Sequence, residues 1–288
     1  MATVPATVTA RAILSSSPMR WAVGGWSFFI LENLVLSENR TYLIERLGDG
    51  GYHAAYGTLS TAAMASVGYG YLKKVRGAEP LLWAARSPAP AGARVMGFLC
   101  LSVGLGMASQ IPPKIQIPVH FVGGDNGGNN AGEVGETAVM PTADAPNEKK
   151  GWQVRCPFDF TDNKNPDGEL HGTERITRHP GLWSFGLLGL GNALLVPSLP
   201  QRAWLAMPAM VALIGGAHTD SRFRRGMGGT LPKEYDEVTS NVPFLAMSSG
   251  RQGSVVEAAR EFWGEVKPLN ALVAVGTAGV WVLRRGRG

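Results

Sequence analysis

Two histidines and one arginine have the residue types and positions that could support chemistry. Arg178, His179 and Pro180 directly precede one apolar stretch, and His218 lies at the end of the next one. Two imidazoles at one depth could ligate a haem iron or another metal, because neutral ring nitrogen is a common ligand for both. An arginine and a histidine at a helix start could instead bind an anionic cofactor tail. A third interpretation is a hydrogen-bond network that pins two helices and binds no ligand.

Further polar groups surround these residues in the expected arrangement. An antiparallel pair of helices would bring His179 and His218 to the same end, within reach of each other or of one common group. A first apolar segment would end on the same face. The polar residues that would gather there are Arg175, Arg178, Asp220, Arg222, Glu32, Asn33 and Arg40. His53 opens the second segment and could reach this cluster, whereas His120 and His171 lie in a polar stretch and are expected to face solvent or a partner.

Six apolar segments could position these groups. They run over residues 21–37, 52–72, 95–111, 181–199, 203–219 and 269–283. Helices that cross a bilayer need about 17–25 mostly apolar residues, and aromatic residues mark the ends of several of these segments. The alternative is a set of buried helices in a soluble protein. The pattern favours an all-α, polytopic membrane bundle of about six transmembrane helices with a long polar loop.

Charge gives this bundle an orientation and divides the chain into four parts. With six spans, one face carries eleven basic residues against Glu79 alone: Arg11, Arg20, Lys73, Lys74, Arg76, Arg86, Arg94, Arg202, Arg284, Arg285 and Arg287. That face is expected to point to the cytoplasm, matrix or stroma. The parts are an N-terminal tail (1–20), three spans (21–111), a polar loop (112–178), and a last part (179–288) with the helical hairpin, an amphipathic stretch at 254–266 and the final span.

Composition excludes some classes of protein and favours assembly with partners. The net charge is +5, but no stripe of basic and aromatic residues indicates nucleic-acid binding, and two cysteines form no disulfide framework. The first 20 residues are rich in Ser and Thr, contain two arginines and lack acids, which is typical of an organellar targeting segment. A plain cytoplasmic-side tail is the alternative. The 112–178 loop has too little apolar surface to order itself, so it is expected to contact other polypeptides.

A longer pattern resembles the NnrU family, which includes the 15-cis-zeta-carotene isomerase of plants and algae. The similarity begins at Arg175-Ile176-Thr177-Arg178-His179-Pro180 and continues through Gly181-Leu182-Trp183, Gly189-Leu190-Gly191, Ala217-His218, Asp220, Arg222, Val238, Ser240, Val242-Pro243-Phe244 and Gly250-Arg251-Gln252. It is weaker in the first span, from Phe28-Phe29 to Arg40. The Arg-His-Pro element alone is shared with isoprenylcysteine methyltransferase-like membrane enzymes.

The resemblance implies a helical membrane protein and, in its isomerase branch, a haem b held by histidines that acts on a carotenoid double bond. His179 and His218 match family histidines and would be the iron ligands, with Arg178 beside them. This sequence departs from the family at two positions, since Asn33 and Asn192 stand where histidines are common. An amide is a poor haem ligand, so these departures weaken ligation by two histidines.

The departures favour a non-catalytic accessory subunit of a multi-subunit organellar membrane complex, of the respiratory or ATP-synthase type, built on an NnrU-like fold. One alternative is an enzyme, either a haem-dependent zeta-carotene isomerase or a methyltransferase-like protein, and another is a small-molecule or haem-binding sensor. We expect no cofactor, with haem b as the exception if the family activity is retained. The expected partners are other subunits of a membrane complex and lipids, with no nucleic acid. The mitochondrial inner membrane is the favoured location, and a thylakoid or bacterial inner membrane is the alternative.

Overall fold

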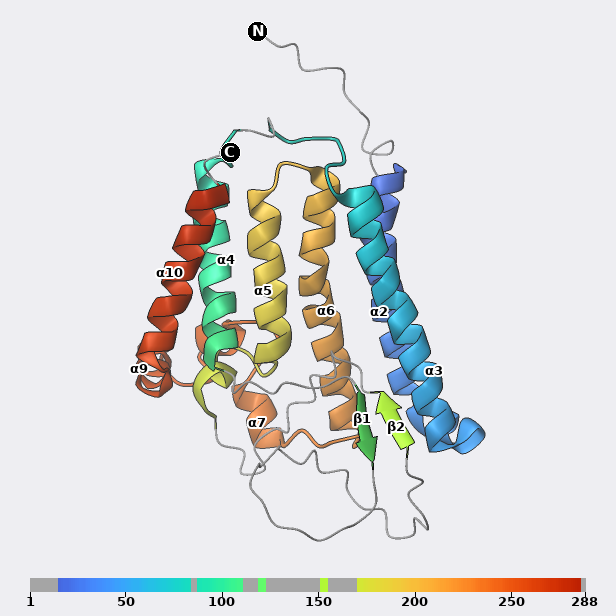
Figure 1. The fold of residues 1–288 in the computed structure, drawn as a ribbon. Helices are drawn as coiled ribbons and strands as arrows, with labels where there is room; N and C mark the ends of the chain where they lie inside the picture. Colours follow the sequence, from blue (N-terminus) through green and yellow to red (C-terminus); the bar gives the residue numbers. More distant parts are fainter. Residues whose placement is uncertain (1–14, 84–86, 111–118, 123–150, 155–169, 286–288) are drawn as a thin grey trace.

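Six long helices form a single row in the part of the chain that the structure, a computed structural model, describes (Figure 1): residues 15–83, 87–110, 119–122, 151–154 and 170–285. The helices are α2 (Ser17–Glu38), α3 (Arg40–Gly70), α4 (Ala91–Gln110), α5 (Pro180–Leu195), α6 (Leu199–Arg224) and α10 (Pro268–Arg285). Neighbours pack in the spatial order α10, α4, α5, α6, α2, α3. The row therefore brings the two halves of the chain together where α6 meets α2.

Short elements gather mainly at one end of this row. They are η1 (Tyr71–Val75), a π-helical turn after α3; β1 (Val119–Val122) and β2 (Gly151–Val154), which pair antiparallel; the 3-10 turn η2 (Gly172–Arg175); and the helices α7 (Lys233–Val238), α8 (Leu245–Ser248) and α9 (Val255–Glu265). In Figure 1, α7, α9 and the strands lie at the end where α5 begins, whereas η1 lies at the opposite end. The expected polar loop, 112–178, falls mostly outside the described residues.

Local sequence signals explain where several helices begin and bend. Ser16 precedes α2 and accepts a hydrogen bond from the backbone N–H of Met19 at 3.4 Å, and Ser198 caps α6 in the same way. Serine at this position satisfies one of the N–H groups that a helix start leaves without a partner. Gly48 has φ 72° inside α3. Glycine adopts this left-handed conformation without steric cost, so α3 bends there.

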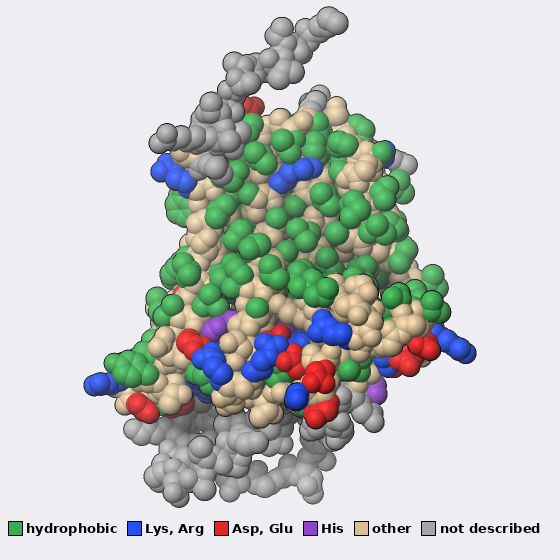
Figure 2. All heavy atoms as spheres, turned by 180° about the vertical axis from the view of Figure 1, so that it is seen from behind, with side chains coloured by type: hydrophobic (Ala, Val, Ile, Leu, Met, Phe, Trp, Pro, Cys, Tyr) green, Lys and Arg blue, Asp and Glu red, His purple; other side chains and the backbone are tan. Residues whose placement is uncertain are grey.

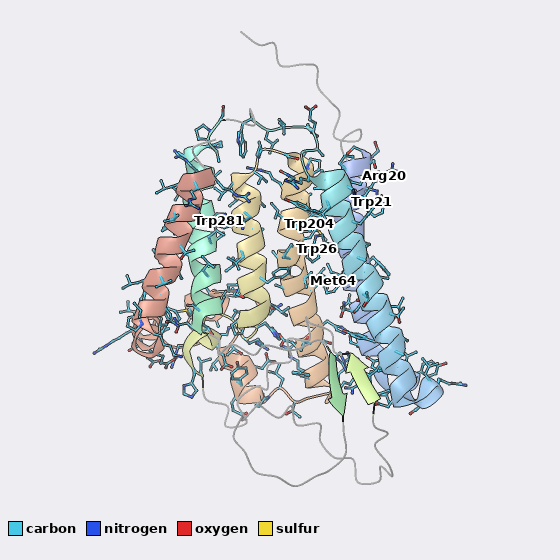
Figure 3. All side chains as sticks on the ribbon, viewed as in Figure 1. Arg20, Trp21, Trp26, Met64, Trp204 and Trp281 are labelled. Atoms are coloured by element: carbon cyan, nitrogen blue, oxygen red, sulfur yellow. The ribbon has the colours of Figure 1, made fainter. Side chains whose placement is uncertain are left out.

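Aromatic and small residues build the core of the row. Trp26 of α2 packs against Trp204 of α6 with ring centroids 5.5 Å apart, and Met64 of α3 packs against the same cluster (Figure 3). Between α5 and α6, a Cβ at Gly186 would lie 3.1 Å from the Cα of Ala209. Close approach of helix backbones through small residues is typical of packing inside membranes. The same feature lets α5 and α6 position the residues at their ends.

The surface of the row is rich in exposed apolar side chains. Large hydrophobic residues are exposed on every long helix except α5, with Leu31, Tyr42, Val95 and Leu272 each more than half exposed. Figure 2 shows these side chains covering the middle of one face, with Lys, Arg, Asp and Glu gathered below them. An apolar surface of this extent marks a contact with lipid or protein.

Length and hydropathy single out fewer spans than the sequence analysis expects. Every expected segment overlaps a long helix, but among the described residues only α4 is long and apolar enough to cross a membrane by itself. The pair α9 and α10 passes the same test together, although the two helices are bent by 100°. α5 has only 16 residues, and the other helices carry more polar and charged groups. The all-helical architecture is confirmed, whereas crossing by all six helices is not.

Candidate functional site

A buried histidine–aspartate pair joins α5 to α6. His179 directly precedes α5, and its Nε2 lies 2.9 Å from Oδ1 of Asp220, near the end of α6. Each residue is only 3% exposed. Asp220 also lies 3.4 Å from the guanidinium of Arg178, and a carboxylate ionised by such a neighbour can only accept hydrogen bonds. The shared proton therefore belongs to Nε2, and His179 donates to Asp220.

Arg178 extends this pair into a chain of alternating charges. Its NH1 donates to Oδ1 of Asp236 at 2.5 Å, and its NH2 donates to the backbone oxygen of Thr239 at 2.8 Å. Arg224 donates to both carboxylate oxygens of Asp236, at 2.6 and 2.8 Å. Hydrogen bonds from Arg224 and then Arg178 lower the pKa of Asp236 to about 2. Two arginines and two aspartates balance each other, so the network needs no external charge.

The backbone before His179 is fixed by a second segment of chain. The N–H of Arg178 donates to the carbonyl oxygen of Ser240 at 2.9 Å, and the Thr177 hydroxyl donates to that of Asn241 at 2.6 Å. The Asn241 side chain in turn accepts from the Trp183 indole at 3.0 Å and donates to the Leu213 carbonyl at 2.9 Å. This segment therefore contacts both helices of the hairpin and fixes the angle at which α5 begins.

An outer ion pair connects this region to α9. The Arg175 guanidinium donates to Glu265 and to Glu261, with nitrogen–oxygen distances of 2.7 Å to each. The hydrogen bond from Arg175 keeps the pKa of Glu265 below its usual range. Gln252 donates to the carbonyl oxygens of Arg175 and Val238, both at 3.0 Å. Arg175 and Gln252 stand at the two ends of the pattern that resembles the family. Their contacts hold segments of the chain together.

His218 makes a different set of contacts. Its Nε2 lies 2.8 Å from the hydroxyl of Ser37, on α2, and 4.0 Å from the carboxylate of Glu38. Glu38 also pairs with Arg225 at 2.6 Å. Residues two apart on an α-helix point about 200° apart, so His218 and Asp220 project from nearly opposite sides of α6. The structure thus brings His179, Arg178 and Asp220 together, but it directs His218 to the α2 side.

The asparagines at the two departures from the family pattern serve as helix contacts. Asn33 donates to Glu32 at 2.6 Å and accepts from the Tyr56 hydroxyl at the same distance, which joins α2 to α3. Asn192 accepts from the indole of Trp281 at 3.0 Å, which joins α5 to α10 (Figure 3). Neither asparagine contacts the His179 network. Glu32 is buried between α2 and α3, where it accepts from Ser60.

The remaining predicted residues lie elsewhere. Arg40 lies over the ring of Tyr52 at 6.0 Å from its centroid. His53 lies 3.5 Å from Asp49, a half-exposed pair on α3 that is separate from the network. His171 precedes η2, and the side chain of His120 is outside the described residues.

The arrangement does not fit a haem iron held by both His179 and His218. The Nε2 of His179 is engaged in a hydrogen bond with Asp220, so this ring nitrogen is not available to a metal. His218 projects from the other side of α6 and hydrogen-bonds to Ser37. Within the side chains that the structure describes, no three of His, Cys, Asp and Glu gather as metal ligands. The geometry supports a helix-joining network.

Sequence reasoning missed two charged members of this network. Asp236 is one of four charged residues in α7, and Arg224 is one of three arginines within the four positions 222–225. Such residues are usually solvated, so composition does not distinguish Asp236 from Glu234 or Glu237. The single available signal was the need to neutralise a buried Arg178.

Comparison with known proteins identifies a family match for this chain. No curated protein and no solved structure shows a significant match to the chain. A match to the family described as NnrU protein covers residues 22–283, from within α2 to within α10. It includes all six long helices and every residue of the His179 network, so this chain is a member of the NnrU family.

Proposed function

We propose that this chain is a membrane-embedded, non-catalytic subunit of a larger protein complex. The observation that carries the proposal is the closed network at the end of α5 and α6. His179, Arg178 and Asp220 are each about 97% buried, and their charges are neutralised by residues of the same chain. A catalytic centre needs polar groups that are accessible to a substrate. The buried groups of this network are not accessible in this way, and in this proposal their role is to stabilise helix packing.

The apolar surface supports the membrane part of the proposal. The long helices expose many large hydrophobic side chains around the middle of the row, and charged residues lie at its ends. A bilayer about 30 Å thick would cover such a band. In this proposal all six helices cross the membrane, with the short helix α5 surrounded by its neighbours α4 and α6.

The location and the partners belong to the same proposal. The basic, acid-free segment at residues 1–20 favours an organelle, with the mitochondrial inner membrane first and a thylakoid or bacterial inner membrane as alternatives. The partners are other subunits of a respiratory or ATP-synthase type of complex and lipids. The polar loop at 112–178, most of which lies outside the described residues, is the proposed contact with those subunits.

Native electrophoresis of gently solubilised membranes tests this proposal. The wild-type chain is expected to migrate in a complex larger than itself, and the purified complex is expected to show no haem Soret band from this chain. His179→Ala should release the chain from the complex, because the variant loses the bond that joins α5 to α6. His53→Ala is the matched control, since its partner Asp49 is exposed.

The alternative function predicts the opposite results in these experiments. NnrU membership favours a haem-dependent zeta-carotene isomerase as the second candidate. A Soret band that disappears in His179→Ala, while the size of the complex is unchanged, would refute the structural subunit and support the isomerase.

A further inference from the structure

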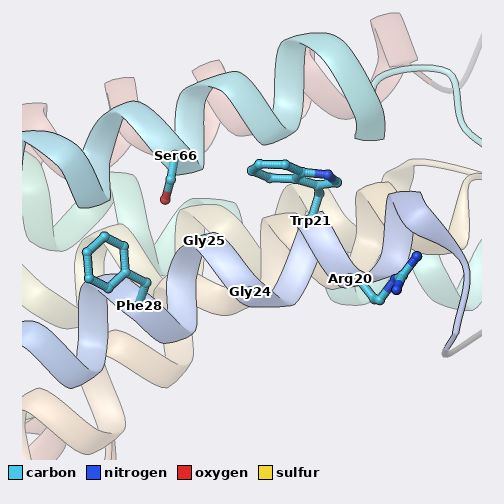
Figure 4. Close-up of a pocket in the computed structure, with 6 residues that line it drawn as sticks. All are labelled: Arg20, Trp21, Gly24, Gly25, Phe28 and Ser66. Atoms are coloured by element: carbon cyan, nitrogen blue, oxygen red, sulfur yellow. The ribbon is translucent and has the colours of Figure 1, made fainter.

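A groove on the outside of the helix row runs between α2 and α3. It has a volume of about 320 Å³ and lies near the end where α2 begins and α3 ends (Figure 4). Its walls are almost entirely apolar, apart from one cation and one hydroxyl. The residues that line it are Arg20, Trp21, Gly24, Gly25, Phe28 and Ser66.

Two neighbouring glycines shape this groove in different ways. A Cβ at Gly25 would lie 3.2 Å from the backbone of Val67, so this glycine allows α2 to lie close to α3. A Cβ at Gly24 would have no atom within 4 Å, so this glycine leaves open space on the outer side. Trp21 and Phe28 stand at either side of the glycines along α2 (Figure 4). The result is an apolar trough that is open to the surroundings of the protein.

The mouth of the trough is positively charged. Arg20 is exposed and lies in the first turn of α2, a turn that contains no acidic residue. Among the described residues, Arg20 forms no ion pair with a carboxylate. The start of a helix adds a partial positive charge of its own. Lys73 and Lys74 are exposed on η1, which packs against α2 at this end. An anion at the mouth would therefore be attracted from several directions.

We propose that this groove binds an anionic phospholipid, with an acyl chain along Gly24 and Phe28 and the phosphate paired with Arg20. The proposal rests on the membrane embedding in the proposed function. A lipid combines the two chemistries that the groove presents, since arginines near a bilayer surface attract anionic headgroups and apolar troughs accept acyl chains. A helix of a second copy would cover the trough but would leave Arg20 without an anion.

Native mass spectrometry of the purified full-length chain tests the proposal. The chain, in a mild detergent, is given equal amounts of phosphatidylglycerol and phosphatidylcholine, and the retained lipid is counted. The wild-type chain is expected to retain one phosphatidylglycerol in preference. Arg20→Gln should lower this preference about fivefold, the factor that one cation contributes near a charged bilayer surface. Gly24→Leu should abolish retention of either lipid, because its side chain fills the trough.

Two matched variants serve as controls. Arg285→Gln removes a cation from α10, at the opposite edge of the row, and should leave the preference unchanged. Gly106→Leu adds the same side chain at a glycine of α4 that also has no atom within 4 Å of its Cβ position, and should retain the lipid. Equal effects of Arg20→Gln and Arg285→Gln, or lipid retention by Gly24→Leu, would overturn the proposal.

Other outcomes distinguish a failure of the lipid proposal from a failure of the proposed function. A wild-type dimer that Gly24→Leu converts to a monomer would assign the groove to a second copy and overturn the lipid. A chain that fractionates with membranes but shows no lipid preference would refute only the proposal that the groove binds an anionic lipid. A chain that does not fractionate with membranes would refute both.

Discussion

Removing the charge of Asp220 while keeping its shape should destabilise the protein more than any comparable surface change. Asp220→Asn leaves a residue of the same size beside His179 and Arg178, but the amide carries no charge for either. Hydrogen bonds to charged groups contribute about 1.5–3 kcal/mol, and breaking a buried ion pair costs about 3–5 kcal/mol. Arg178 retains its bond to Asp236, at 2.5 Å, so the lower range applies. We therefore expect a loss of about 2–3 kcal/mol.

Thermal unfolding of the purified chain in a mild detergent, followed by tryptophan fluorescence, measures this loss. A change of 1 kcal/mol shifts the midpoint by about 2 °C in chains of this size, so Asp220→Asn should lower it by about 4–6 °C. Asp49→Asn is the matched control, because Asp49 also lies beside a histidine but its side chain is 61% exposed. An exposed pair contributes at most about 1 kcal/mol. If the two variants shift the midpoint equally, the network does not stabilise the fold and the reasoning fails.

Three further perturbations test separate parts of the structure. Because Arg224 helps to lower the pKa of Asp236 to about 2, the stability from this carboxylate is present above its unfolded pKa and is lost as pH falls through the folded value. Between about pH 4 and 2, the free energy of unfolding of the wild type should therefore fall by about 1–2 kcal/mol more than that of Asp236→Asn. This energy allows for the partial exposure of Asp236, and unfolding experiments at each pH measure it. Gly189→Ala would place its Cβ against the Leu205 carbonyl oxygen and should cost about 1–3 kcal/mol in unfolding experiments, whereas Gly106→Ala, which meets nothing, should be neutral or stabilising. Arg175→Gln removes both ion pairs to α9, so limited proteolysis near α9 should become faster, while an unchanged rate would show that α9 is fixed by other contacts.

The positions of the long helices follow from the sequence because apolar runs are local signals. Each of the six expected segments overlaps a long helix, and the amphipathic stretch at 254–266 contains α9, which begins at a capping box formed by Ser254 and Glu257. Helix ends were less predictable. α3 begins at Arg40, twelve residues before the apolar run at Tyr52, because helix formation continues through polar residues that apolar periodicity does not detect.

Part of the candidate site was also predictable from the sequence. The family-like pattern and the short connection between α5 and α6 predict that His179 and the end of α6 meet, and the His179–Asp220 distance of 2.9 Å agrees with this. The hairpin alone does not define how α6 is rotated about its axis. That rotation turns Asp220 toward His179 and His218 toward Ser37, and it depends on how α2 packs against α6.

The helical class, the family and the meeting of α5 with α6 can be predicted from the amino-acid sequence, because they depend on apolar periodicity and on residues close together in the chain. Which charges neutralise one another depends on the packing of distant segments and is visible in the fold alone. Asp236 and Arg178 are separated by 58 residues, and nothing in the local sequence of Asp236 distinguishes it from solvated neighbours. They pair because burial of Arg178 makes an uncompensated charge costly, and the fold brings α7 to the place where that charge is buried.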